Sequence, residues 1–186
     1  GTEKPMDFAL LNAVLRTFDV PPVDPWFSGE SMNYYYVGYS IVGVLIHLTD
    51  VTPAVGYNLA LAVVLGMAAV VAGSAGYDIS TLVGAGRLGR RTSGLLSGAL
   101  VVVAGNLAVT REVLKGPAID GQGFWQGIGW HASRTIQRET TEGLVDYTIN
   151  EFPAFSFILG DLHPHVMALP FTALAVSVAV QWMIAG

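Results

Sequence analysis

The sequence predicts an all-α fold, a polytopic bundle of membrane helices. Hydrophobic residues make up 52% of the chain, and its mean hydropathy is +0.53. Only 12% of the residues are charged, whereas soluble domains carry about 25%. The apolar residues also gather in long stretches, as membrane-spanning helices require. We therefore expect about three spanning helices with additional juxtamembrane or re-entrant helices, in a multi-pass protein of the cell membrane whose partner is the lipid bilayer.

Composition also excludes several classes of site and partner. The absence of cysteine excludes a disulfide framework and thiolate metal sites. Lys and Arg number 9 against 14 acidic residues, so the chain lacks the basic surface that nucleic acid needs. It opens without an initiator Met, directly into a polar stretch, and we expect it to be a fragment of a larger membrane protein. The oligomeric state is left open.

Hydropathy defines four apolar segments, at roughly 34–49, 54–76, 93–110 and 164–185. The last three are long enough to cross a ~30 Å hydrocarbon core, provided that the third extends to about residue 114. The first is short, begins with a cluster of tyrosines and closes on His47 and Asp50. Because tyrosine prefers the headgroup level, we interpret this segment as interfacial or re-entrant.

Charge placement orients these segments. The connection 84–92 holds Arg87, Arg90 and Arg91 without an acid, so the positive-inside rule makes it cytoplasmic. If 34–49 spans the membrane, the two long polar segments lie on opposite sides. We favour the arrangement in which it does not. The chain is then a single membrane domain, 1–186, with four parts: an external loop at 1–53, a helical hairpin at 54–114, an external loop at 115–163 and a spanning helix at 164–186.

An acidic side chain projects from the apolar face of the first predicted helix. This helix is expected over about 5–17, because a proline in the first turn needs no N–H. On a helical wheel Asp7 lies among the apolar residues Leu10, Leu11 and Val14. A carboxylate there needs a partner, a ligand or a raised pKa. The alternative is that Asp7 caps the start of the helix or pairs with Lys4.

Aromatic residues fill the following loop, where Trp26 and Tyr35 could stack on a sugar ring, although an aromatic belt at the membrane boundary explains them equally. Further along, Arg134 and Arg138 are four residues apart. On a helix they would share a face and could grip a phosphate. Arg138 could instead pair with Glu142, which is also four residues away.

The densest group of ionisable residues is Asp161-Leu162-His163-Pro164-His165, at the start of the last apolar segment. Ionisable residues at a membrane boundary are candidates for function. Asp161 is placed to cap the helix, with Pro164 in its first turn. The two imidazoles could bind phosphate, shuttle a proton or, with Glu151, ligate a divalent metal. The helical zinc spacing of four residues is absent, and His163 and His165 would face different sides of a helix.

Four stretches of the sequence resemble a known family: Glu3-Lys4-Pro5-Met6-Asp7-Phe8, Asp24-Pro25-Trp26-Phe27, Asn33-Tyr34-Tyr35-Tyr36, and Phe152 to Phe157 followed by Asp161 to His165. The chain resembles the polytopic family of archaea and Chloroflexi that is named for its triple tyrosine. That family in turn resembles the C-type (GT-C) membrane glycosyltransferases, such as protein O-mannosyltransferases and the aminoarabinose transferases of lipid A.

The resemblance implies a GT-C-like fold and a sugar transferred from a polyprenyl-phosphate donor on the external face. Asp7 falls where the catalytic acid of that fold lies, and Glu3 is the second candidate. We expect Asp7 to act as general base, while the phosphate is held by Arg134, Arg138, His163 and His165, with Asp161, Trp26 and Tyr35 as further binding residues. No cofactor is certain, and a divalent metal is left open. The alternatives are a transporter or flippase-like module, in which the histidines relay protons, and a non-catalytic assembly subunit.

Overall fold

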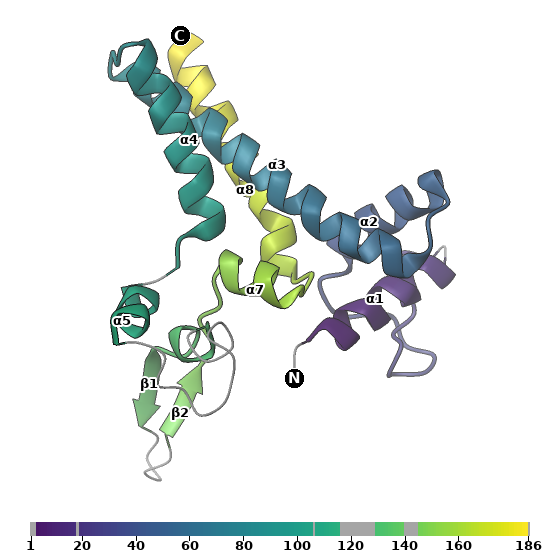
Figure 1. Cartoon of the computed structure of the whole chain (residues 1–186). Coiled ribbons are helices and arrows are strands. Elements are labelled where there is room, and N and C mark those ends of the chain that lie inside the picture. The colour runs from purple at the N-terminus through teal and green to yellow at the C-terminus, as the bar shows by residue number, and fades with distance from the viewer. Residues whose placement is uncertain (1–2, 18, 106, 116–128, 140–144, 186) are drawn as a thin grey trace.

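The computed structural model describes residues 3–17, 19–105, 107–115, 129–139 and 145–185, which form a mostly helical chain (Figure 1). In chain order the elements are α1 (Lys4–Arg16), α2 (Tyr36–Thr49), α3 (Pro53–Leu82), α4 (Arg87–Val103), α5 (Leu107–Lys115), β1 (Ile136–Glu139), β2 (Val145–Thr148), α7 (Pro153–Leu159) and α8 (Pro164–Ala185). The predicted all-α class is confirmed. A short antiparallel hairpin, β1–β2, is the one addition that the sequence did not indicate.

Two of the described helices, α3 and α8, are long and apolar enough to cross a bilayer. They have 30 and 22 residues, and only 28% and 22% of their most apolar windows are buried within the protein. Their remaining apolar faces are therefore available to lipid. Helix α2 has 14 residues, or about 21 Å, too short to span. This length agrees with the juxtamembrane or re-entrant interpretation of residues 34–49.

The third predicted span is not one continuous helix. Helix α4 ends at Val103, the backbone at Ala104 is extended, and α5 begins at Leu107. Gly105 lies against the ring of Phe152, only 3.0 Å from where its Cβ would be. The prediction of a single helix over 93–110 was wrong, because hydropathy does not register this break in the backbone.

Small residues allow α3 and α4 to pack closely as an antiparallel hairpin. A Cβ on Gly73 would lie 3.1 Å from the carbonyl oxygen of Gly94, and one on Gly98 would lie 2.5 Å from that of Ala69. Such contacts between backbones are typical of helix pairs in membranes. The seam leaves no room for a lipid chain between the two helices.

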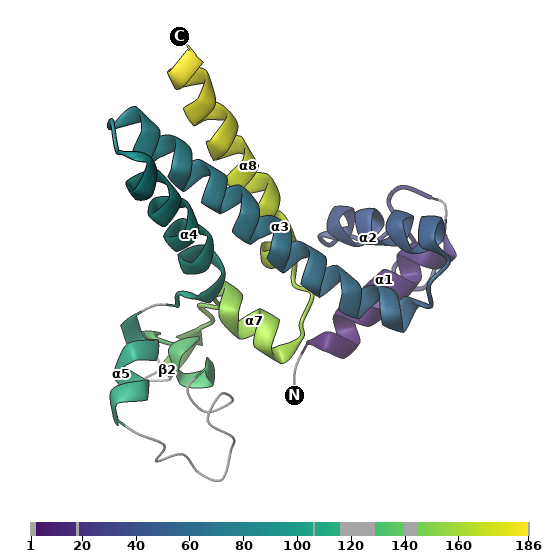
Figure 2. The same cartoon turned by 45° about the horizontal axis from the view of Figure 1, so that its top comes forward.

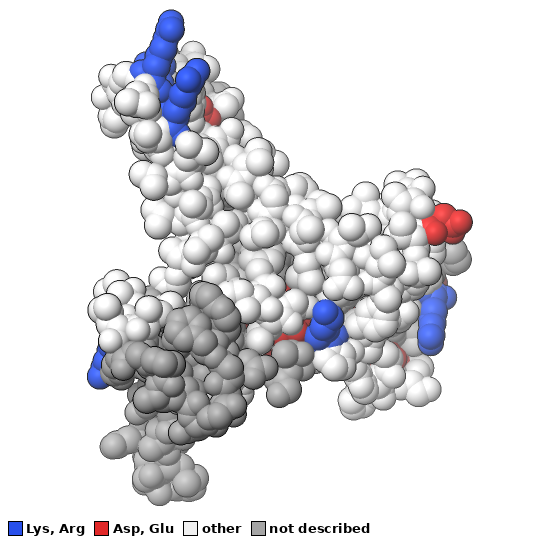
Figure 3. Space-filling view, in the orientation of Figure 1, with Lys and Arg blue, Asp and Glu red and all other residues white. Residues whose placement is uncertain are grey.

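The principal core joins α1, α2 and the first turns of α3 to the loop that precedes α8. Its largest side chains include Leu11, Tyr39, Tyr57 and Leu162, all at most 1% exposed. In both views α1 and α2 cross near the start of α3, whereas the α3–α4 turn and the C-terminal end of α8 lie at the opposite end (Figures 1 and 2). Basic side chains gather at that turn (Figure 3).

Candidate functional site

The carboxylate of Asp7 lies in the centre of this core. Asp7 is 0% exposed, between the buried leucines Leu10 and Leu11 of α1. The hydroxyl of Tyr39 on α2 donates to its Oδ1 at 2.7 Å, and the hydroxyl of Tyr57 on α3 lies 3.5 Å from its Oδ2. The prediction that Asp7 projects from the apolar face is confirmed. Two tyrosines, rather than the helix start or Lys4, are the hydrogen-bond partners of its carboxylate.

Tyr57 connects this carboxylate to the loop between α7 and α8. Its hydroxyl oxygen accepts the N–H of Leu162 at 2.9 Å and lies 3.2 Å from the carbonyl oxygen of Gly160. Gly160 ends α7 with a left-handed backbone (φ 73°), a conformation that favours glycine. The ammonium of Lys4 lies 5.4 Å from the centre of the Tyr57 ring. Helices α1, α2 and α3 therefore hold the histidine-containing loop in place.

The two histidines lie side by side at the start of α8. Their rings are stacked, with centroids 5.4 Å apart and an angle of 23° between planes. The carbonyl of His163 accepts the first backbone hydrogen bonds of the helix, from Val166 and Met167. Because His163 precedes the helix, the expectation that the two rings face different sides was wrong. Asp161 does not cap α8, although Pro164 does occupy its first position.

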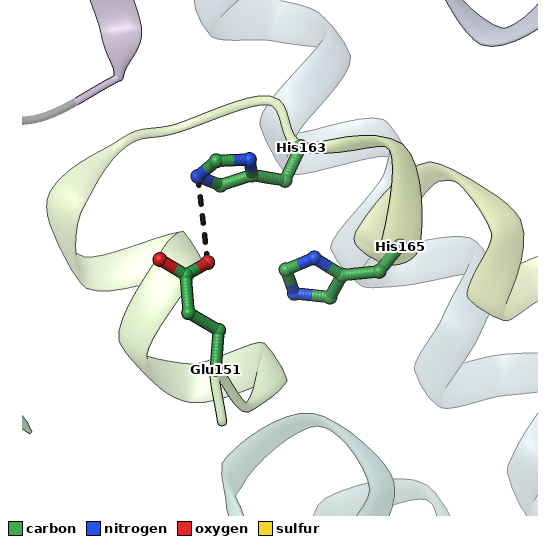
Figure 4. Close-up of side chains that lie close together, drawn as sticks. All are labelled: Glu151, His163 and His165. Carbon is green, nitrogen blue, oxygen red and sulfur yellow. Dashed lines mark ion pairs between the residues drawn. The ribbon is translucent and has the colours of Figure 1, made fainter. Parts of the chain in front are cut away.

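Three carboxylates lie within 4.0 Å of His163, and Figure 4 shows one of them, that of Glu151. Nε2 of His163 lies 3.4 Å from Oε2 of Glu151 and 4.0 Å from Oδ2 of Asp161, and its Nδ1 lies 3.6 Å from Oε2 of Glu3. Ser156, on α7, places its hydroxyl 3.3 Å from the same Glu151 oxygen and 3.2 Å from Nε2 of His165. Elements from both ends of the chain therefore form one acid and imidazole cluster.

Burial sets the electrostatics of this cluster. Loss of solvation raises the pKa of Asp7, although the Tyr39 hydrogen bond and nearby His163 oppose the shift. Burial likewise raises the pKa of Asp161 against the attraction of His163. Asp161 is 2% exposed, and its Oδ1 has no hydrogen-bond partner among the described residues. Burial thus favours the protonated, neutral form of both carboxyl groups.

Two cavities adjoin the cluster. A polar pocket of about 350 Å³ is lined by Tyr34, Tyr35, His163, Pro164, His165 and Ala168. An apolar groove of about 390 Å³ runs between α2, α3 and α8 and includes Gly38, Leu45, Val63, Met167 and Phe171. Both are of the size of small-molecule sites. The two cavities have no lining residue in common, but they come close along α8, where Met167 meets Gly38 in the groove and Ala168 lines the pocket.

The whole chain can be compared with known families. The family described as "Uncharacterized membrane protein (DUF2298)" matches residues 1–186. The chain belongs to this family. No curated protein and no solved structure matches the chain. Membership establishes a membrane protein, and with α3 and α8 it supports the lipid bilayer as the surroundings of this DUF2298 chain.

Seven of the residues singled out from the sequence lie at the cluster or its pocket: Glu3, Asp7, Tyr35, Glu151, Asp161, His163 and His165. Asp7 is not among the residues that line the pocket. Tyr35 lines the pocket, whereas Trp26, which is 58% exposed, does not.

The predicted pair of arginines on one helix face is wrong, because Arg138 lies in strand β1. The guanidinium of Arg134 lies 3.3 Å from the centre of the Trp130 ring and donates to Ser133 at 2.7 Å. The side chain of Arg138, and Glu142 as a whole, lie outside the described residues.

Sequence reasoning missed the residues that hold the cluster together. Tyr39, in the tyrosine-rich first apolar segment, and Tyr57, in the second, were not singled out, yet both hydroxyls lie at the carboxylate of Asp7. Ser156 was not singled out. The signal was present in part: a buried carboxylate requires donors, and tyrosine hydroxyls near the ends of two apolar segments were the available ones. Their convergence depends on how α1 crosses α2 and α3, which local sequence does not encode.

Proposed function

We propose that this DUF2298 protein is a membrane glycosyltransferase that takes its sugar from a polyprenyl-phosphate donor. The observation that carries the proposal is the pairing of a polar pocket with an apolar groove at the start of α8. A lipid-linked sugar has the same two parts. The resemblance of the chain to the triple-tyrosine and GT-C proteins supports the same activity, and no nucleic acid takes part.

In this proposal the prenyl chain lies in the groove between α2, α3 and α8, and the phosphate and sugar enter the pocket. The α3–α4 seam is closed to the prenyl chain by contacts such as that of Gly98 with Ala69. Tyr34 and Tyr35 form an aromatic wall on which a sugar can stack. His163 and His165 form the opposite wall, next to the leaving phosphate.

The transfer itself is a displacement at the anomeric carbon. The oxygen of the acceptor hydroxyl forms a bond to that carbon, the bond to the phosphate oxygen breaks, and its electron pair leaves with the polyprenyl phosphate. Asp7 takes the proton of the acceptor, a role for which a desolvated carboxylate with a raised pKa is suited. The acceptor reaches Asp7 by replacing the hydroxyl of Tyr57, the more distant of its two partners.

The length of α3 supports an external position for this site. Its 30 residues extend about 45 Å, more than a ~30 Å hydrocarbon core. Tyr57, in its first turns, touches the cluster, while Arg87 and Arg91 follow its other end. With the arginine turn in the cytoplasm, the cluster lies on the external face of a multi-pass protein. A transporter would need a pathway between helices, and the α3–α4 seam offers none.

The experiment is complementation in a strain that lacks the gene, with glycans and lipid-linked sugars measured by mass spectrometry. Full-length protein with Asp7→Asn should restore about 10²–10⁴-fold less product than wild type, because a general base contributes that much. Asp19→Asn is the matched control, since Asp19 is an exposed carboxylate in the following loop. Wild-type product from Asp7→Asn would exclude the general-base role, and an unchanged glycan profile in the deleted strain would exclude the activity.

A further inference from the structure

We infer that Glu151, His163 and His165 bind a divalent transition-metal ion of the zinc type. Each residue offers one ligand atom, and the three atoms lie within 4.8 Å of one another. Two imidazoles and one carboxylate form a ligand set of catalytic zinc sites, in which a fourth position stays open. The same set suits zinc better than magnesium, which prefers oxygen ligands alone.

The distances fit a site that needs little rearrangement. Zinc at about 2.0–2.1 Å from each ligand separates tetrahedral neighbours by roughly 3.3 Å, and Oε2 of Glu151 is 3.4 Å from Nε2 of His163. The exposed His165 ring, already stacked on His163, has the freedom to complete the set. The hydroxyl of Ser156 lies 3.3 Å from Oε2 of Glu151 and 3.2 Å from Nε2 of His165. On metal binding His165 either exchanges this serine contact for the ion or ligates the ion through Nδ1.

The carboxylate of Glu3, beside the other ring nitrogen of His163, supports the metal site independently. Oε2 of Glu3 lies 3.6 Å from Nδ1 of His163, on the side of the ring away from Glu151. Metal-binding histidines usually donate their other N–H to such a carboxylate, which fixes the tautomer and the orientation of the ring. In this arrangement Nδ1 carries the proton, and Nε2 presents its lone pair to the ion.

The charge of the site points in the same direction. Four carboxylates, those of Glu3, Asp7, Glu151 and Asp161, gather around His163, and the buried Oδ1 of Asp161 lacks a partner among the described residues. In their ionised form these groups repel the phosphate of a lipid donor, whereas a bound dication favours the ionised carboxylates and attracts the phosphate. Only this role toward the donor rests on the proposed function. Binding of the ion does not.

The test uses the purified full-length protein in detergent, stripped with a chelator and titrated with Zn²⁺ by calorimetry and with Co²⁺ by visible absorption. We expect about one ion per chain and ligand-field bands of tetrahedral cobalt. Glu3→Gln, which removes the carboxylate beside His163, should weaken metal binding by about 10–100-fold. Glu151→Gln and His165→Ala, which remove proposed ligands, should weaken it by at least as much. His131→Ala, at an exposed histidine outside the cluster, is the matched control.

Absence of binding to the wild type, or wild-type affinity in both Glu151→Gln and His165→Ala, would overturn the metal site. Because His165 is exposed, its variant should fold, and a melting curve like that of wild type verifies this. The two proposals separate cleanly. Sugar transfer that persists in chelator without bound metal refutes only the role of the ion toward the donor, whereas stoichiometric cobalt binding in a protein without transfer refutes the proposed function and supports the metal site.

Discussion

Replacing Tyr39 by Phe removes one hydroxyl from a fully buried polar contact, that with Asp7. Tyr39 and Asp7 are both 0% exposed, and the hydroxyl lies 2.7 Å from the carboxylate. Hydrogen bonds to charged groups contribute about 1.5–3 kcal/mol to stability. Because Asp7 is buried, water cannot replace the hydrogen bond that its carboxylate loses. The remaining partner, Tyr57, is 3.5 Å away and cannot replace it. We expect Tyr39→Phe to lower the free energy of unfolding by about 2 kcal/mol.

The assay is a double-mutant cycle of Tyr39→Phe and Asp7→Leu, with unfolding followed in detergent. The coupling energy should be about 1.5–3 kcal/mol. Tyr77→Phe, at a tyrosine that is 42% exposed, should change stability by no more than about 0.5 kcal/mol. Additivity of the two substitutions within about 0.5 kcal/mol would show that the contact does not exist in the protein.

Three further predictions concern the buried acid, the groove and the helix seam. Because burial raises the pKa of Asp7 in the folded state, its protonated form stabilises the fold at low pH, and this stability is lost as pH rises through the raised pKa. The melting temperature of wild type should therefore fall relative to that of Asp7→Asn as pH rises above the ordinary carboxylate pKa of about 4, and a pH-independent difference would contradict the raised pKa. Gly38→Leu should abolish retention of a lipid chain in native mass spectrometry, because even a Cβ there lies 2.8 Å from Met167; undiminished retention would place the chain elsewhere. Gly98→Leu should lower the free energy of unfolding by about 1–3 kcal/mol, whereas Gly66→Leu, with open space around its Cβ, should not. Equal melting temperatures of the two variants would argue against close packing of α3 on α4.

The local sequence pattern was sufficient to predict the helices that bury one face or span the membrane. Composition predicted the membrane class, and the proline at each start placed α1 and α8 within one or two residues of their observed bounds. The break between α4 and α5 was missed because Ala104 and Gly105 are as compatible with a spanning helix as with its end. The β1–β2 hairpin was missed because charged residues such as Arg138 and Glu139 carry no clear strand signal.

The sequence predicted several residues of the candidate site but not how they are arranged in space. Asp7, His163 and His165 stand out because ionisable groups are rare in so apolar a chain. Their partners do not, since Tyr39 and Tyr57 look like ordinary residues of a membrane boundary. What unites them is the crossing of α1 over α2 and α3, a tertiary contact between segments far apart in sequence.

The claim on which the account depends is that the acid and imidazole cluster faces the outside while the arginine turn faces the cytoplasm. Residues 1–186 contain no cysteine, so single-cysteine variants within them can be labelled in intact cells with a membrane-impermeant maleimide, in a full-length protein in which any cysteine elsewhere is replaced. We expect Tyr35→Cys to react with the maleimide in intact cells and Arg91→Cys to react only after permeabilisation. Labelling of both positions from the same side would contradict this claim.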